Sequence, residues 1–117
     1  MPHNFDDLRT AIRAFAQARD WEQFHTPKNL VMALSVENAE LLEHFQWLTP
    51  EQSTRLDDKT KAEVAQEIGD VLIYLTRLAD VLDIDPLQAA FDKIELNAVK
   101  YPVEKSKGNN TKYDKLQ

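Results

Sequence analysis

The chain has 117 residues, a formal net charge of -6 at pH 7 and no cysteine. This length supports one hydrophobic core, so we expect a single domain over residues 1–117 in which residues 101–117 form a C-terminal tail. The acidic balance disfavours nucleic-acid binding, the lack of cysteine excludes disulfides and thiolate sites, and no apolar run suits a membrane span or a signal peptide, so we expect a cytoplasmic protein.

Apolar residues recur at helical spacing, whereas the period-two alternation typical of strands is missing. The expected helices run from Phe5 to about Arg19, from Pro27 to about Leu48, from about Lys59 to Leu82, and from Leu87 to about Lys100. Thr26-Pro27 and Asp85-Pro86 each place an N-cap residue before a proline at the first helical position. The sequence therefore predicts an all-α, four-helix bundle-like domain, with residues 51–58 as a surface loop.

Two of these helices have well-defined apolar stripes. On the second helix the residues expected to point inward are Leu30, Leu34, Leu41, Phe45 and Leu48. On the third helix they are Val64, Ile68, Val71, Leu75, Leu78 and Leu82. The fold would bury these two stripes against each other.

Acidic residues interrupt or flank both apolar stripes. Glu37 and Glu40 on the second helix, and Glu67 and Asp70 on the third, have the i, i+3 spacing of neighbours on one helix face. A carboxylate beside a core must be paired or metal-bound because it loses hydration there. A metal site is favoured over the alternative, a structural network of ion pairs.

The donor atoms narrow the choice of metal. Oxygen ligands suit Mg²⁺, with Mn²⁺ as a second choice, better than zinc or copper. A di-iron centre would need a histidine three residues after a glutamate on two helices. His44 follows Glu40 by four residues, which disfavours that centre.

Aromatic and basic side chains lie near the acids in the sequence. Trp21 and Trp47 border the proposed site, with His25 and Tyr74 nearby, and such rings can stack on a nucleobase. The alternative is that both tryptophans close the ends of the helical core. Lys93, Asn97 and Lys100 share one face of the fourth helix, where they would either hold phosphate oxygens or form an ordinary solvated stripe.

Three segments carry a recognisable pattern, namely RDWEQFHTPKNLVMALSVENAELLEHFQW, EIGDVLIYLTRLAD and KIELNAVKYPVEKS. Together they resemble the all-α MazG-like nucleotide pyrophosphohydrolases, and among these the dCTP pyrophosphatase branch. The resemblance implies hydrolysis of a nucleoside triphosphate, preferably dCTP, to the monophosphate and pyrophosphate.

The resemblance also implies roles for individual residues. The four acids would be the magnesium ligands, although Glu40 could instead act as the general base. The nucleotide and its phosphates would be bound by Trp21, His25, Trp47, Tyr74, Lys93, Asn97 and Lys100. A homo-oligomer is implied, a helical dimer or a tetramer built as a dimer of dimers, in which the tail with Lys112 and Tyr113 closes over a neighbour's triphosphate.

Two other functions remain open on the sequence. The chain could be a non-catalytic helical dimerisation or interaction module whose acids form interface salt bridges. It could also keep the pocket and act on another triphosphate, including modified cytosine nucleotides.

Overall fold

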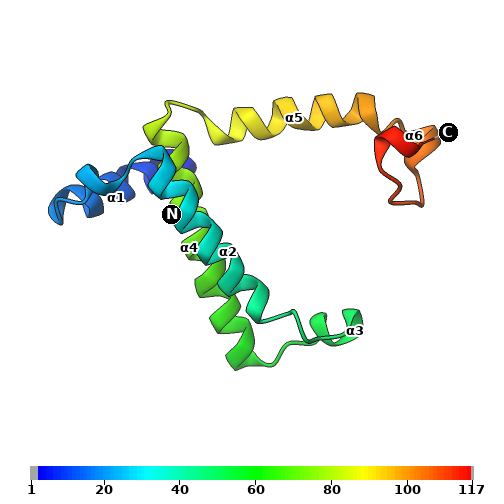
Figure 1. Ribbon diagram of the computed structural model, residues 1–117, viewed down its shortest axis with the longest axis horizontal. Coiled ribbons are helices and arrows are strands. Elements are labelled where there is room, and N and C mark those ends of the chain that lie inside the picture. Colours follow the sequence, from blue (N-terminus) through cyan, green and yellow to red (C-terminus); the bar gives the residue numbers. More distant parts are fainter. Residues whose placement is uncertain (1–2, 117) are drawn as a thin grey trace. The chain divides into compact units, whose positions relative to one another are not determined.

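A computed structural model describes residues 3–116 (Figure 1). These residues form two units, one that ends at Asp83 and one that begins at Ile84. The first unit contains α1 (Phe5–Ala18), η1 (Glu22–Phe24), α2 (Pro27–Glu43), α3 (Pro50–Ser53) and α4 (Asp58–Val81). The second contains α5 (Pro86–Lys100), α6 (Val103–Ser106) and η2 (Tyr113–Lys115). Helices are the only regular elements over residues 3–116, which confirms the predicted all-α class.

The predicted cap signals begin the helices as expected. The Thr26 hydroxyl accepts a hydrogen bond from the Asn29 N–H at 3.2 Å, and Pro27 is the first residue of α2. Asp85 caps α5 in the same way before Pro86. Each cap satisfies an N–H group that would otherwise lack a partner in the first turn.

The first unit is organised around a hairpin of α2 and α4, which lie side by side in Figure 1. The hairpin is antiparallel, because Ala33 shares a hollow with Tyr74 while Leu41 and Phe45 share another with Val64. Leu30 of α2 is only 1% exposed, and α1 packs on α4 and buries Ala16. A short hydrophobic seam therefore holds the three helices together.

The predicted end of the second helix is wrong by five residues, because α2 stops at Glu43 rather than near Leu48. Beyond Glu43 the backbone hydrogen bonds become shorter in range. The Leu42 carbonyl accepts both from the Phe45 N–H and from the Gln46 N–H, each at 2.9 Å. The chain then turns toward Thr49, which caps the four-residue helix α3 in the predicted loop. Shared carbonyl acceptors of this kind are common where a helix ends.

The apolar stripe of α4 is only partly covered by the rest of the first unit. Val64 is buried, whereas Ile68 is 52% exposed and Leu75 and Leu82 are also exposed. Large exposed apolar patches mark interaction sites with proteins or membranes, or ligand-binding grooves.

The second unit consists of α5 and a tail that folds back onto the end of this helix. The Tyr113 ring lies edge-on to Tyr101 at 6.1 Å between centroids, and Lys100 Nζ lies 4.8 Å from the centre of the Tyr113 ring. Three of the four expected long helices thus belong to the first unit and α5 to the second. The closed four-helix bundle, the single domain and the dimer stay predictions. None of the helices in residues 3–116 has the length and apolar character required to cross a bilayer.

Candidate metal and nucleotide site

The hairpin brings three of the four predicted acids together. Glu37 extends from α2, and Glu67 and Asp70 extend from neighbouring turns of α4. One carboxylate oxygen from each of these residues lies within 4.8 Å of the other two. The i, i+3 pair on one helix and a single acid on its antiparallel neighbour therefore form a compact oxygen cluster.

The electrostatics of this cluster are unfavourable without a counter-charge. Partial burial, followed by the neighbouring carboxylates of Glu40, Asp70 and Glu67, raises the pKa of Glu37 to about 7. Burial, Glu40 and Asp70 likewise raise the pKa of Glu67, against a smaller opposing effect of His44. Like charges that share a partly dry site disfavour ionisation, so the cluster favours a proton or a cation.

The residues present fit a hard divalent cation. Glu37 Oε2 and Glu67 Oε2 are buried and have no hydrogen-bond partner among the described residues. Two oxygens bound to one Mg²⁺ at about 2.1 Å each are at most roughly 4.2 Å apart. The observed cluster is close to that size, so small rotations of the side chains would suffice.

The fourth predicted acid, Glu40, lies beside this trio but is not one of its three members. It is near enough to Glu37 and Glu67 to raise the pKa of both. Farther along the hairpin, His44 Nδ1 lies 3.9 Å from Glu63 Oε2. Glu40 therefore sits at the edge of the cluster, where a water-activating base could act.

A hollow of about 320 Å³ gathers three of the predicted nucleotide residues, Trp21, His25 and Tyr74. The left-handed backbone of Asp20 (φ 54°) ends the turn after α1, and Trp21 N–H then donates to the Ala16 carbonyl at 2.9 Å. The Trp21 and His25 rings meet at 66° with their centroids 6.5 Å apart.

This hollow adjoins the acid cluster along both helices of the hairpin. Its lining residue Ala33 lies four residues before Glu37 on α2, and Tyr74 lies four residues after Asp70 on α4. Four residues are about one helical turn, or roughly 6 Å of rise. Aromatic and carboxylate surfaces are thus adjacent in a single chain.

An ionic network around the buried side chains of Arg77 and Asp80 was not predicted. Arg77 Nε donates to His25 Nδ1 at 3.1 Å, and Arg77 Nη1 lies 3.4 Å from Asp80 Oδ2. Arg13 from α1 donates to the same Asp80 carboxylate. The signal was present in the sequence, because Arg77 follows Tyr74 by three residues and continues the stripe of Glu67 and Asp70.

The remaining predicted residues are Trp47 and three polar residues of α5. Trp47 lies beyond the end of α2, is 87% exposed, and is separated from Trp21 by the 17 residues of α2, about 25 Å of helix. Lys93, Asn97 and Lys100 are exposed on α5 in the second unit. Their predicted contacts with a nucleotide stay predictions.

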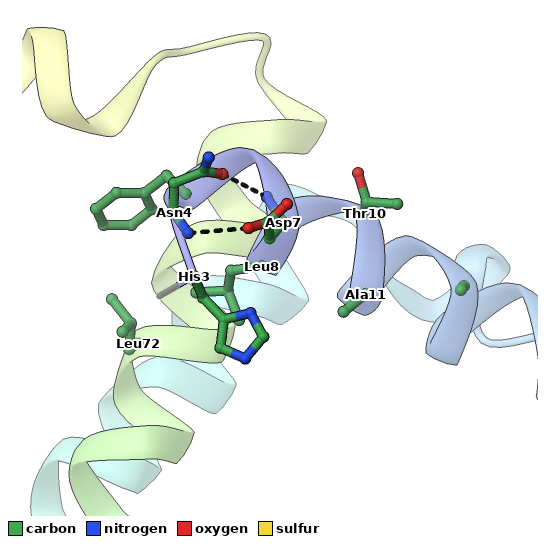
Figure 2. Close-up of a pocket in the computed structure, with 9 residues that line it drawn as sticks. His3, Asn4, Asp7, Leu8, Thr10, Ala11 and Leu72 are labelled. Atoms are coloured by element: carbon green, nitrogen blue, oxygen red, sulfur yellow. Dashed lines mark hydrogen bonds between the residues drawn. The ribbon is translucent and has the colours of Figure 1, made fainter. Parts of the chain in front are cut away.

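Another hollow, of about 900 Å³, lies between the start of α1 and Leu72 of α4 (Figure 2). Figure 2 shows that the Asn4 and Asp7 side chains there are engaged in the reciprocal capping bonds of α1. None of the predicted site residues lines this hollow, and the rest of its lining is mostly apolar. Its chemistry does not match a phosphate or metal site.

Comparison with known proteins agrees with the class that the fold and the acid cluster define. The model of the MazG-like family matches residues 32–116, so the chain belongs to this family. It is similar to dCTP pyrophosphatase 1 of Mus musculus, with 42% identity, and to that of Homo sapiens, with 38% identity. Each match extends over 113 residues, which are 95% of this chain and 66% of the relative, so the chain spans just under two thirds of those proteins.

A solved structure also resembles the chain. The crystal structure of a pyrophosphatase from Archaeoglobus fulgidus matches with a TM-score of 0.81 and 44% identity, over 87% of this chain and 95% of that one. The likeness covers most of both chains and agrees with the all-helical architecture.

Proposed function

We propose that this protein hydrolyses a nucleoside triphosphate to the nucleoside monophosphate and pyrophosphate. One observation carries the proposal, namely that Glu37, Glu67 and Asp70 converge one helical turn from an aromatic hollow in a chain of the MazG-like family. The relatives named above as pyrophosphatases support the reaction, and those named dCTP pyrophosphatase 1 support dCTP as the preferred substrate.

Glu37, Glu67 and Asp70 would hold Mg²⁺, or Mn²⁺ in its place. When bound, the metal would neutralise phosphate charge and lower the pKa of a water molecule. Glu40 is assigned to accept the proton of the attacking water, because it borders the trio without belonging to it. The water oxygen then bonds to the α-phosphorus as the α–β anhydride bond breaks, and pyrophosphate leaves.

The base end of the substrate would lie in the hollow of Trp21, His25 and Tyr74, where the Trp21 ring offers a stacking face. Lys93, Asn97 and Lys100 would contact the phosphates, and Trp47 would complete the pocket. Trp47 lies far along α2 from Trp21, so its participation requires a second copy of the chain.

The exposed apolar side chains support a homo-oligomer, either a dimer or a tetramer. On the hairpin these include Val31, Ile68, Leu72, Ile73 and Leu75. Burial of such surface is worth about 25 cal/mol per Å², which favours assembly. The same observation supports the second candidate, a non-catalytic interaction module, and catalytic turnover distinguishes the two.

The test measures pyrophosphate released from a panel of nucleoside triphosphates that includes dCTP and 5-methyl-dCTP, with Mg²⁺, with Mn²⁺ and with a chelator. We expect saturable, metal-dependent release that is fastest with a cytosine nucleotide. Glu37→Gln should abolish release, whereas Glu43→Gln, an exposed acid on the same helix, should not. Undetectable release by the folded chain would favour the interaction module, whereas metal-independent release would contradict the assignment of the three acids as metal ligands.

A further inference from the structure

Arg77 is a buried charge that the proposed reaction does not use. Its side chain is 9% exposed, and a guanidinium in such a position must be paired because its desolvation is costly. One partner is Asp80, which Arg13 holds with its own hydrogen bonds. The other is His25, whose Nδ1 accepts from Arg77 Nε at 3.1 Å. The guanidinium is therefore fixed on both sides.

This contact determines the tautomer of His25. A guanidinium has only N–H donors, so Nδ1 of the histidine must present its lone pair. In the neutral ring the proton then lies on Nε2. Burial, followed by the charge of Arg77, lowers the pKa of His25, while Glu22 opposes the shift. The ring is consequently a neutral donor at its Nε2 atom.

His25 belongs to the hollow that is proposed to hold the nucleobase. His25 lines it together with Trp21 and Tyr74, and the steep angle between the Trp21 and His25 rings points to different contacts for each. A base stacked on Trp21 would offer its face to the indole and its edge to the imidazole. Hydrogen bonds to base edges, unlike stacking, distinguish one base from another.

We propose that Arg77 is a positioning residue that fixes His25 as a hydrogen-bond donor, through Nε2–H, to a carbonyl oxygen or ring-nitrogen lone pair on the edge of the nucleobase. This inference rests on the proposed function, because it requires a nucleotide in the hollow. It assigns base recognition to a network that reaches from α1 through Asp80 and Arg77 to the imidazole.

The tautomer is measured first, on the full chain without nucleotide, by NMR of ¹⁵N-labelled histidine side chains. We expect the His25 ring to be protonated at Nε2 only. In Arg77→Met the ring should exchange between tautomers and titrate nearer the ordinary histidine pKa of about 6.5. His44 provides the internal reference. A proton on Nδ1 in the wild-type chain would overturn the proposal.

Base recognition is measured second, as KM for dCTP and as the Kd of α,β-imido dCTP, which cannot be hydrolysed. Loss of one neutral hydrogen bond should raise both constants about fivefold to tenfold in Arg77→Met and leave kcat within about twofold. The matched control is Arg55→Met, an exposed arginine outside the network. If Arg77→Met does not fold, Arg77→Lys replaces it, since lysine keeps the charge near Asp80 but lacks the Nε donor.

Two variants of His25 distinguish the contribution of the Nε2–H donor from that of the imidazole ring. The amide N–H of glutamine reaches the position of Nε2, whereas asparagine is too short. His25→Gln should therefore bind α,β-imido dCTP more tightly than His25→Asn. If His25→Asn or Arg77→Met binds α,β-imido dCTP as tightly as the wild-type chain does, the positioning role is overturned but the proposed function is not. Absence of both nucleotide binding and hydrolysis in the wild-type chain overturns the proposed function and this role together.

Discussion

Arg13 of α1 and Asp80 of α4 are joined by two hydrogen bonds, from Nε to Oδ2 at 2.7 Å and from Nη2 to Oδ1. The residues are 67 positions apart in the sequence, and their pairing joins α1 to the C-terminal end of α4. The Asp80 side chain is 8% exposed, so its charge depends on these donors.

Asp80→Asn should lower the free energy of unfolding by about 2 kcal/mol, the usual scale for hydrogen bonds to a charged group. Urea unfolding followed by circular dichroism measures the change. Asp6→Asn is the matched control, because Asp6 is exposed and its one ion pair within residues 3–116 is with Arg9, three residues away. An equal loss in both variants would contradict the special role of the Arg13–Asp80 pair.

The same pair predicts how acid affects stability. The hydrogen bond from Arg13 and the charges of Arg13, Arg77 and Arg9 lower the pKa of Asp80. The stabilisation is therefore complete above the ordinary carboxyl pKa of about 3.9 and is lost as the pH falls through the lower, folded-state value. The stability difference between wild type and Asp80→Asn should shrink over that range. A difference independent of pH would be inconsistent with this assignment.

The raised pKa of Glu37 should make the stability of the metal-free chain depend on pH in the opposite direction. Its pKa is raised from 4.5 to about 7, so the folded chain holds this proton more tightly than the unfolded chain does. The free energy of unfolding should consequently fall as the pH rises between those two values. Glu37→Gln should remove most of this fall. Urea unfolding at pH 5 and pH 8 in the presence of a chelator tests it.

Divalent cations should stabilise the wild-type chain. A ligand at 100 times its Kd adds about 2.7 kcal/mol to the free energy of unfolding when it binds only the folded state. Mg²⁺ should raise the Tm of wild type and of Glu43→Gln, and should have little effect on Glu67→Gln. An equal rise in all three would show that the ion binds outside the acid cluster.

Gly69 lies between Glu67 and Asp70 in the middle of α4, and a Cβ built there meets no atom within 4 Å. Glycine in a helix interior costs about 1 kcal/mol relative to alanine. Gly69→Ala should therefore raise the free energy of unfolding by up to that amount, as measured by urea unfolding of the chain at low concentration. Destabilisation would reveal that another chain approaches this position closely.

The contact between Tyr113 and the end of α5 should slow hydrogen exchange in the tail. Tyr113→Ala removes the ring that meets both Tyr101 and Lys100. Hydrogen exchange of residues 103–116 should accelerate, whereas α4 should be unaffected. Lys115→Ala is the control. Unchanged exchange of the tail would mean that other contacts hold it.

Much of the fold could be predicted because its signals are local. Caps at Thr26 and Asp85 begin helices through contacts within a few residues, and the i, i+3 spacing of Glu67 and Asp70 sets them on one face. The early end of α2 was not predictable in this way. The apolar stripe continues through Phe45 and Leu48, and periodicity does not distinguish a helix from the tightened turns that replace it.

The long-range part of the site needed the structure. The i, i+3 spacing of Arg77 and Asp80 is visible in the sequence, but only the packing of α1 on α4 shows that Arg13 joins them in one network. The trio of Glu37, Glu67 and Asp70 was accessible to sequence reasoning because it needs only one helix pairing. The separation of Trp47 from Trp21 was implied by the expected helix between them, although both were predicted to border one pocket.

That early helix end gives the chain two independent optical reporters. Trp47 stands in water at 87% exposure, whereas Trp21 is half covered between Phe15 and His25. The length of α2 separates the two indoles, so they report on different events. Assembly that covers Trp47 would shift its emission to shorter wavelength as the chain concentration rises. Nucleotide that stacks on Trp21 would quench emission at constant concentration, and Trp47→Phe would isolate that second signal.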